Sequence, residues 1–167
     1  MHDLLPSEKI GTLRSGPIYI VDEVNGKEYV RYTGPKAQQV KLLIQELLDW
    51  VDVNDVKLHP ILIASILHFE FVSIHPFSDG NGRVTRLLTL LFLRQMGYGM
   101  KNALIPDIYY IHNKPGYYQA LNRANNYIGR RKADLTPWFE YFTTGLLVIA
   151  QDLQQQISLV QSTKLNS

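Results

Sequence analysis

Apolar residues recur along most of the chain at the three- and four-residue spacing of amphipathic helices. Between Lys36 and Val53 this spacing defines one apolar face, which consists of Val40, Leu43, Ile44, Leu47, Leu48 and Val51. The next apolar segment, from His59 to Ile74, is hydrophobic almost all round, which is typical of a central helix covered on every side. We expect it to end near His75, because Pro76 disfavours helical geometry in the residue before it.

Three further helices are predicted from the same periodicity and from residues that begin or stop helices. One begins after Gly82 and continues to Met96, where Gly97 stops it. Another extends from Lys114 to Tyr127. The last extends from Thr136, an N-cap residue followed by proline, to Val160.

The beginning of the chain has a different pattern. Residues 17–21 and 28–32 are short runs rich in β-branched and aromatic side chains, which favour strands. They flank Asn25-Gly26, a dipeptide that tolerates the positive φ angles of a tight hairpin turn, and Gly34-Pro35 stops the second run. The sequence therefore predicts a mainly α domain that carries one N-terminal β-hairpin.

Composition and charge narrow the classes of function. With 167 residues the chain is long enough for one domain with its own core, and its formal charge of +2 includes no long basic run that would indicate a nucleic-acid partner. It has no cysteine, which excludes disulfides and thiol nucleophiles. It also lacks a signal-peptide pattern and the ~18-residue apolar run of a membrane span. We therefore expect a cytoplasmic protein that binds neither nucleic acid nor membrane.

Twelve residues, His75 to Arg86, collect groups that suit phosphate chemistry; they read His-Pro-Phe-Ser-Asp-Gly-Asn-Gly-Arg-Val-Thr-Arg. The glycines allow a phosphate to approach the backbone, and the open N–H groups at a helix start attract anions. Arg83 and Arg86 project from one face of the first helical turn, and guanidinium groups bind phosphate oxygens in a bidentate manner. Asp79 can hold Mg²⁺, which usually shares its oxygen ligands with substrate phosphates. His75 can accept a proton near neutral pH.

Each of these features alone has a simpler explanation. A histidine at a helix end is usually a cap, a Gly-Asn-Gly run is usually a turn, and Asp79 could merely cap the next helix. Their combination within twelve residues is more informative. A base, a metal ligand, an anion cradle and two arginines together describe phosphoryl or nucleotidyl transfer.

The segment resembles the signature of the Fic family, His-x-Phe-x-Asp/Glu-Gly-Asn-Gly-Arg-x-x-Arg, at every fixed position. The hairpin, the helix that begins at His59 and the run from Tyr117 to Leu121 are also similar to Fic domains. The resemblance implies a Fic domain over residues 16–160, with a lead segment 1–15 and a C-terminal tail 161–167. It further implies an adenylyltransferase that moves AMP from ATP to a Ser, Thr or Tyr hydroxyl of a target protein and releases pyrophosphate.

The resemblance also implies a role for each motif residue. His75 would be the general base that deprotonates the target hydroxyl, Phe77 would anchor the loop in the core, and Asp79 would bind Mg²⁺ between the α- and β-phosphates. The remaining motif residues would bind phosphate: Gly80, Asn81 and Gly82 as the anion hole, and Arg83 and Arg86 at the β- and γ-phosphates. Doc-type kinases carry lysine at the position of Gly82, so glycine there indicates nucleotidyl transfer.

Two further sites are implied outside the motif. Tyr118 and Asn125 match positions that line the adenine pocket of Fic enzymes, and seven-residue spacing places them on one face of the predicted helix. Alternatively, Tyr118 is simply a core residue. The hairpin is similar to the Fic flap, whose exposed edge pairs with an extended segment of the target protein; its candidate residues are Ile18, Tyr19 and Ile20. A hairpin could equally serve only to cover the core.

Other functions and modes of regulation stay open. A Fic enzyme could use UTP, GTP or a CDP-alcohol as donor, and a non-catalytic nucleotide-binding module is a further alternative, although degenerate members usually lose the histidine or the glycines. Many Fic proteins carry an inhibitory helix with the pattern Ser/Thr-x-x-x-Glu-Gly/Asn, which does not occur in this chain. Either the chain is a truncated piece, or inhibition comes from a separate antitoxin-like protein or segment.

Overall fold

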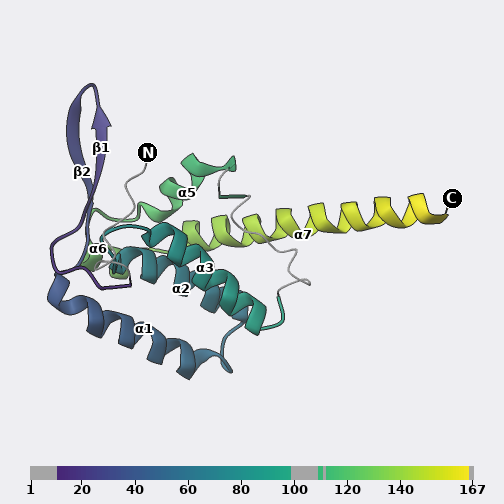
Figure 1. The fold of residues 1–167 in the computed structure, drawn as a ribbon, viewed down its shortest axis with the longest axis horizontal. Helices are drawn as coiled ribbons and strands as arrows, with labels where there is room; N and C mark the ends of the chain where they lie inside the picture. The colour runs from purple at the N-terminus through teal and green to yellow at the C-terminus, as the bar shows by residue number, and fades with distance from the viewer. Residues whose placement is uncertain (1–10, 99–108, 111, 166–167) are drawn as a thin grey trace.

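The computed structural model describes residues 11–98, 109–110 and 112–165, and it is mainly helical (Figure 1). The elements follow in the order β1 (Tyr19–Val24), β2 (Lys27–Thr33), a short 3₁₀ turn (Ala37–Gln39), α1 (Val40–Asn54), α2 (Pro60–Ile74), α3 (Asn81–Gln95), α5 (Lys114–Leu121), α6 (Tyr127–Lys132) and α7 (Thr136–Leu165). None of the helices within the described part of the chain is long and apolar enough to cross a membrane.

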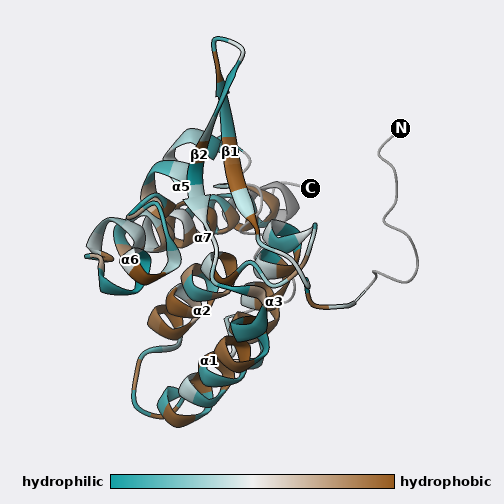
Figure 2. Ribbon diagram, turned by 90° about the vertical axis from the view of Figure 1, so that its left-hand side faces the viewer, coloured by the Kyte–Doolittle hydropathy of each residue, from teal (hydrophilic) through white to brown (hydrophobic). Residues whose placement is uncertain are grey.

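Helix α2 is the centre of the domain, as its all-round hydrophobicity predicts. It contacts α1, α3, α6 and α7, and it is coloured as hydrophobic along most of its length in Figure 2. Its start is fixed by the His59 side chain, which accepts a hydrogen bond from the backbone N–H of Ile61, and by proline at the first helical position. Its end lies at Ile74, immediately before His75, as expected.

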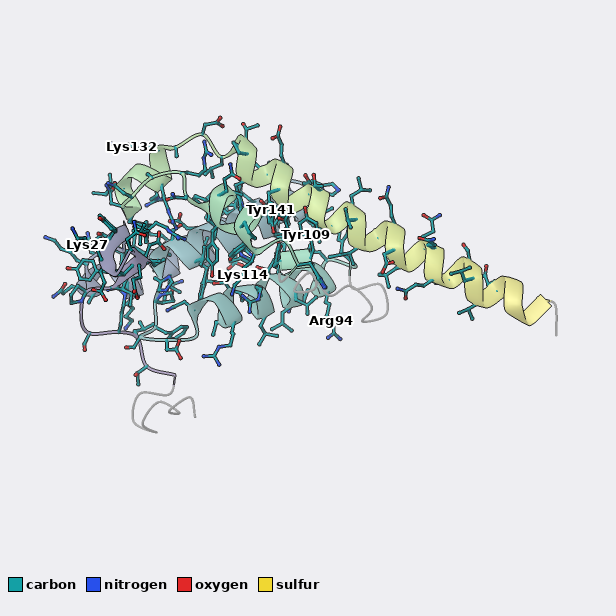
Figure 3. The ribbon with its side chains drawn as sticks, turned by 90° about the horizontal axis from the view of Figure 1, so that it is seen from above. Lys27, Arg94, Tyr109, Lys114, Lys132 and Tyr141 are labelled. Carbon is teal, nitrogen blue, oxygen red and sulfur yellow. The ribbon has the colours of Figure 1, made fainter. Side chains whose placement is uncertain are left out.

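The first half of α7 closes the core against α2. Trp138 and Phe142 are fully buried, and the indole N–H of Trp138 donates a 2.9 Å hydrogen bond to the carbonyl oxygen of Ser65. Tyr109 and Tyr141, both labelled in Figure 3, pack with ring centroids 5.4 Å apart. The second half of α7 extends beyond the other elements (Figures 1 and 3). The helix ends at Leu165, beyond the predicted end at Val160.

The predicted hairpin is confirmed, with strands shifted by up to three residues from the expected ranges. Asn25 and Gly26 form the turn with φ angles of 54° and 72°, the positive values that this dipeptide tolerates. The two strands are antiparallel, and the register is interrupted by a bulge at Ile20/Val21: Ile20 lies opposite Tyr32, and Val21 lies opposite Val30. The hairpin projects from the helices in both Figure 1 and Figure 2.

The base of the hairpin is fastened to the helical core. Tyr32 is fully buried, and its hydroxyl donates a 2.6 Å hydrogen bond to the carbonyl oxygen of Ser73 in α2. The Arg130 guanidinium lies 3.7 Å from the centroid of the Tyr32 ring, a cation–π contact. These contacts place the hairpin directly beside the end of α2, and therefore beside His75.

The single helix predicted from Lys114 to Tyr127 is wrong. Helix α5 ends at Leu121, and after a turn the shorter helix α6 begins at Tyr127. Asn126 caps α6, because its side-chain oxygen accepts a 2.8 Å hydrogen bond from Gly129 N–H. The turn is also held by strand β2, whose Thr33 N–H donates a 2.9 Å hydrogen bond to the carbonyl oxygen of Asn125. This pairing with a distant segment replaces the helical bonds that local periodicity predicts.

Candidate active site

His75 has a constrained backbone and a defined tautomer. It is the C-cap of α2 and adopts the left-handed conformation, with φ 52° and ψ 62°, which is uncommon for a residue with a side chain. Its Nδ1 lies 2.9 Å from the carbonyl oxygen of Val72. Because a carbonyl can only accept, Nδ1 carries the hydrogen, and in the neutral imidazole Nε2 keeps its lone pair. The geometry therefore presents Nε2 as a proton acceptor.

The surroundings keep this imidazole neutral. Burial lowers the pKa of His75 below its ordinary value. The positive charges of Arg14 and Arg130 lower the pKa further, while the hydrogen bond with Val72 raises it. His75 is consequently in its basic form at neutral pH, which general-base catalysis requires.

The loop after His75 is closed by Asn81. The Asn81 side-chain oxygen accepts a 2.8 Å hydrogen bond from Phe77 N–H, and its amide group donates a 2.8 Å bond to the carbonyl oxygen of Phe77. Asn81 is buried, and the Phe77 ring lies 6.4 Å from that of Phe71 in α2. The Asn81 side chain therefore shapes the loop, so a part in an anion hole is left to its backbone N–H.

A polar hollow of about 280 Å³ lies where this loop enters α3; its lining consists of His75, Ser78, Asp79, Gly80, Asn81, Gly82, Arg83 and Arg86. Gly80 is the N-cap of α3 with φ 79°, and no acidic residue lies in the first helical turn. The first N–H groups of a helix have no acceptor within the helix, and together with the helix dipole they attract anions. A β-carbon at Gly82 would lie 3.3 Å from Nη1 of Arg86, so the backbone here is bare and close to a guanidinium.

Asp79 and Arg83 face each other at the rim of this hollow. Arg83 Nη2 lies 3.0 Å from Asp79 Oδ2, and both side chains are more than half exposed. An exposed ion pair of this kind contributes little to stability. Breaking it so that Asp79 and Arg83 can each contact a ligand would therefore cost little. No cluster of three or more potential metal ligands occurs among the described residues. A single carboxylate fits Mg²⁺ only when the ion arrives with a phosphate ligand, which is its usual mode of binding.

A second hollow of about 260 Å³ adjoins the first, and the two share His75, Gly82 and Arg86. The other residues that line it are Ile20, Arg31, Val72, Tyr117, Tyr118, Leu121, Asn122 and Arg130. It is thus bounded by α2, α3, α5, α6 and the hairpin. The polar hollow suits phosphates, while the second, with its aromatic and apolar wall, suits a base.

Arg31 is a residue of this wall that periodicity does not predict. It lies at the bulge of the hairpin, and bulges re-aim side chains beside active sites. Its guanidinium forms an ion pair with Asp22 and lies 5.4 Å from the centroid of the Tyr118 ring. Arg31 therefore connects the hairpin with α5 across the mouth of the second hollow.

Of the two residues expected at an adenine pocket, only Tyr118 lines this hollow. Asn125 lies beyond the end of α5, so the argument that both residues share a helical face is wrong. The Asn125 side-chain oxygen accepts a 2.9 Å hydrogen bond from the Asn126 side chain. Asn122 lines the hollow instead, and it is the candidate that the expectation of one continuous helix concealed.

The three expected flap residues lie differently. Tyr19 is exposed, whereas Ile20 lines the second hollow. Ile18 precedes β1, and its carbonyl oxygen accepts a 3.1 Å hydrogen bond from Gly34 N–H. A further hollow bounded by α1, α2 and α6, with Trp50 and Arg131 in its wall, contains no motif residue, and it shares Arg130 with the second hollow.

Residues 1–93 match the Fic/DOC family. Two curated relatives are both described as "Protein adenylyltransferase Fic". One, from Drosophila willistoni, is 32% identical over 159 residues, covering 86% of this chain and 30% of the relative. The other, from Nematostella vectensis, is 30% identical over 132 residues, covering 78% and 26%. The chain therefore spans about a third or less of the length of these relatives.

Solved structures show the same fold. A Fic family protein from Desulfovibrio desulfuricans aligns with a TM-score of 0.69 at 28% identity, covering 87% of this chain and 42% of the other. Fic-1 of C. elegans, residues 134–508, aligns with a TM-score of 0.65 at 24% identity, covering 93% and 39%. At 24% identity, the similarity to Fic-1 is a similarity of fold alone.

Proposed function

Because the chain belongs to the Fic/DOC family, we propose that it is a protein adenylyltransferase that transfers AMP from ATP to a Ser, Thr or Tyr hydroxyl of a target protein. The observation that carries this proposal is the position of His75 on the boundary between the two hollows. A base at that boundary can reach a hydroxyl that approaches a phosphate held in the polar hollow. The names of the relatives support the same activity.

In the proposed reaction each group of the site has one task. Nε2 of His75 accepts the proton of the target hydroxyl as its oxygen attacks the α-phosphate, and pyrophosphate leaves. The backbone N–H groups at the start of α3 stabilise the charge that grows on the α-phosphate. Arg83 and Arg86 hold the β- and γ-phosphates. Mg²⁺ bound with the nucleotide would have Asp79 as its protein ligand and would withdraw charge from the phosphates.

The hairpin supplies the place for the target segment. Within the described residues the sheet has two strands, and the outer side of β2 is engaged at its base by the Thr33–Asn126 bridge. The outer edge of β1 is then the one that an extended segment of the target can join, by main-chain hydrogen bonds. Ile20, the second residue of β1, lines the second hollow together with His75.

The experiment offers candidate target proteins together with ATP, UTP, GTP or CTP labelled at the α-phosphate, and in parallel ATP labelled at the γ-phosphate. We expect α-label from ATP to become protein-bound, and His75→Ala to lower the rate by ~10²–10⁴-fold while ATP binding is retained. Arg86→Ala should lower the rate and weaken ATP together, because it removes a charge-assisted phosphate contact.

Other outcomes would redirect the proposal. Transfer of γ-label would indicate a kinase, and preference for another α-labelled donor would replace ATP. ATP binding with no label transferred to any target would favour a non-catalytic module. Arg94→Met, a change at an exposed position near the end of α3, is the matched control and should keep the wild-type rate.

A further inference from the structure

Arg14 contacts the backbone of His75, lines neither hollow, and is almost completely buried. Its four side-chain hydrogen bonds all end on backbone carbonyl oxygens. Nε donates to His75 (2.8 Å) and Nη1 to Gly16 (2.8 Å). Nη2 donates to Pro35 (2.7 Å) and to Ile74 (3.3 Å). Its backbone N–H also donates to the carbonyl oxygen of Pro76, at 2.9 Å.

The guanidinium group of Arg14 is buried and makes nearly all the hydrogen bonds that it can. Guanidinium has five N–H groups, and four of them are satisfied here in a fixed planar fork. A buried cation needs compensation, and the last carbonyl groups of a helix provide it, because they lack partners within the helix and carry the negative end of its dipole. Arg14 therefore acts as a C-terminal cap of α2, supplied by a distant segment.

The four carbonyls belong to two different parts of the site. Those of Ile74 and His75 set the path of the backbone at the left-handed turn from which the imidazole projects. Those of Gly16 and Pro35 lie just before β1 and just after β2, at the two ends of the hairpin. One planar group thus fixes the histidine backbone relative to the base of the hairpin.

We propose that Arg14 is a positioning residue, which holds His75 in its left-handed conformation and in register with the hairpin on which the target segment lies. The kinetic consequence rests on the proposed transferase function. Arg14 touches neither hollow, so it acts through His75 and not on the nucleotide. Misplacing the base should slow the chemical step without weakening ATP.

The first test compares Arg14→Lys and Arg14→Met with Leu93→Ala, a change at a fully buried position in α3. Lysine keeps the positive charge, but its compact ammonium group cannot bridge four separate carbonyls. We expect both Arg14 variants to lose ~100-fold in kcat with little change in the KM and Kd for ATP, the cost of a misplaced catalytic group. Leu93→Ala leaves a cavity in the core but keeps every contact of the His75 backbone, so it should lose stability and keep its kcat. Equal kcat losses in all three variants, or wild-type kcat in Arg14→Lys, would overturn the proposal.

The second test does not depend on activity. In protein labelled with ¹⁵N-histidine, with the His75 signals assigned by their loss in His75→Ala, the nitrogen shifts report which ring nitrogen carries the proton. We expect the Nδ1–H form in the wild type and a mixture of tautomers in Arg14→Lys, because the bond with Val72 depends on the held backbone. An unchanged tautomer in a folded Arg14 variant would overturn the proposal. If the wild type transfers nothing, the proposed function fails, but the tautomer of His75 still tests the role of Arg14. If Arg14→Met does not fold, Arg14→Lys decides both tests.

Discussion

The loop that precedes α3 depends on one amide side chain, and replacing Asn81 with alanine tests that dependence. The change removes both 2.8 Å hydrogen bonds with the backbone of Phe77, in a place where the side chain is only 3% exposed. A buried group that loses its partner costs about 1–3 kcal/mol. Because Phe77 is itself half-buried and some water can reach it, we expect the lower part of the range for two bonds, about 2–4 kcal/mol.

Urea denaturation followed by circular dichroism measures this loss, and calorimetry with inorganic triphosphate measures anion binding at the proposed phosphate site. Asn54→Ala is the matched control, since it removes a single 2.7 Å bond to the carbonyl oxygen of Trp50 at a half-buried position, and it should cost about 1 kcal/mol or less. Triphosphate binding should weaken in Asn81→Ala and persist in Asn54→Ala. Equal destabilisation by the two variants, with triphosphate binding unchanged, would refute the view that Asn81 holds the loop between His75 and α3.

Two further predictions concern acid stability and the nucleotide base. Burial lowers the pKa of His68 to about 3, whereas the unfolded chain takes up this proton near pH 6.5, so His68 stabilises the fold above pH 6.5 and this contribution is lost as the pH falls toward 3. Urea titrations between about pH 7 and pH 5 should show about 1.4 kcal/mol of lost stability per pH unit below 6.5 from this group, in addition to the loss from His75, whose pKa is also lowered. The slope should be smaller by this amount in His68→Gln and unchanged in His59→Gln. Equal slopes in the wild type and both variants would contradict the assignment. Asn125→Ala and Asn122→Ala should each be titrated calorimetrically with ATP and with inorganic triphosphate: loss confined to ATP identifies the residue that contacts the base, and equal loss for both ligands marks a structural effect.

Much of the fold follows from local sequence. Asn25-Gly26 predicts the hairpin because the turn requires two residues that accept positive φ, and the structure gives both of them such angles. The continuous apolar surface of α2 predicts its central place, and Pro76 predicts where it ends. The position of His75 at the start of the loop was predictable for the same reason.

What the sequence does not predict are features decided by distant partners. The turn after Leu121 is fixed by Thr33, nearly ninety residues earlier, so periodicity alone continues the helix too far. The bulge that brings Arg31 to Tyr118 depends on the strand register, which cannot be predicted from any single residue. Arg14 lies in a segment without periodic pattern, and its importance appears only when the four carbonyls around it are brought together.

The hairpin is held at its base by the helical core and is exposed at its tip, so it is supported at one end only, like a cantilever. Tyr32 at the foot is fully buried, whereas Val24, Tyr29 and Val30 toward the tip are more than half exposed. Thermal bending of such a beam grows with distance from its support, so positional accuracy is greatest near the bulge. A target segment lying along β1 would be read most strictly in the few residues beside Ile20 and loosely beyond them. Selectivity between targets would then reside in a short stretch around the modified hydroxyl.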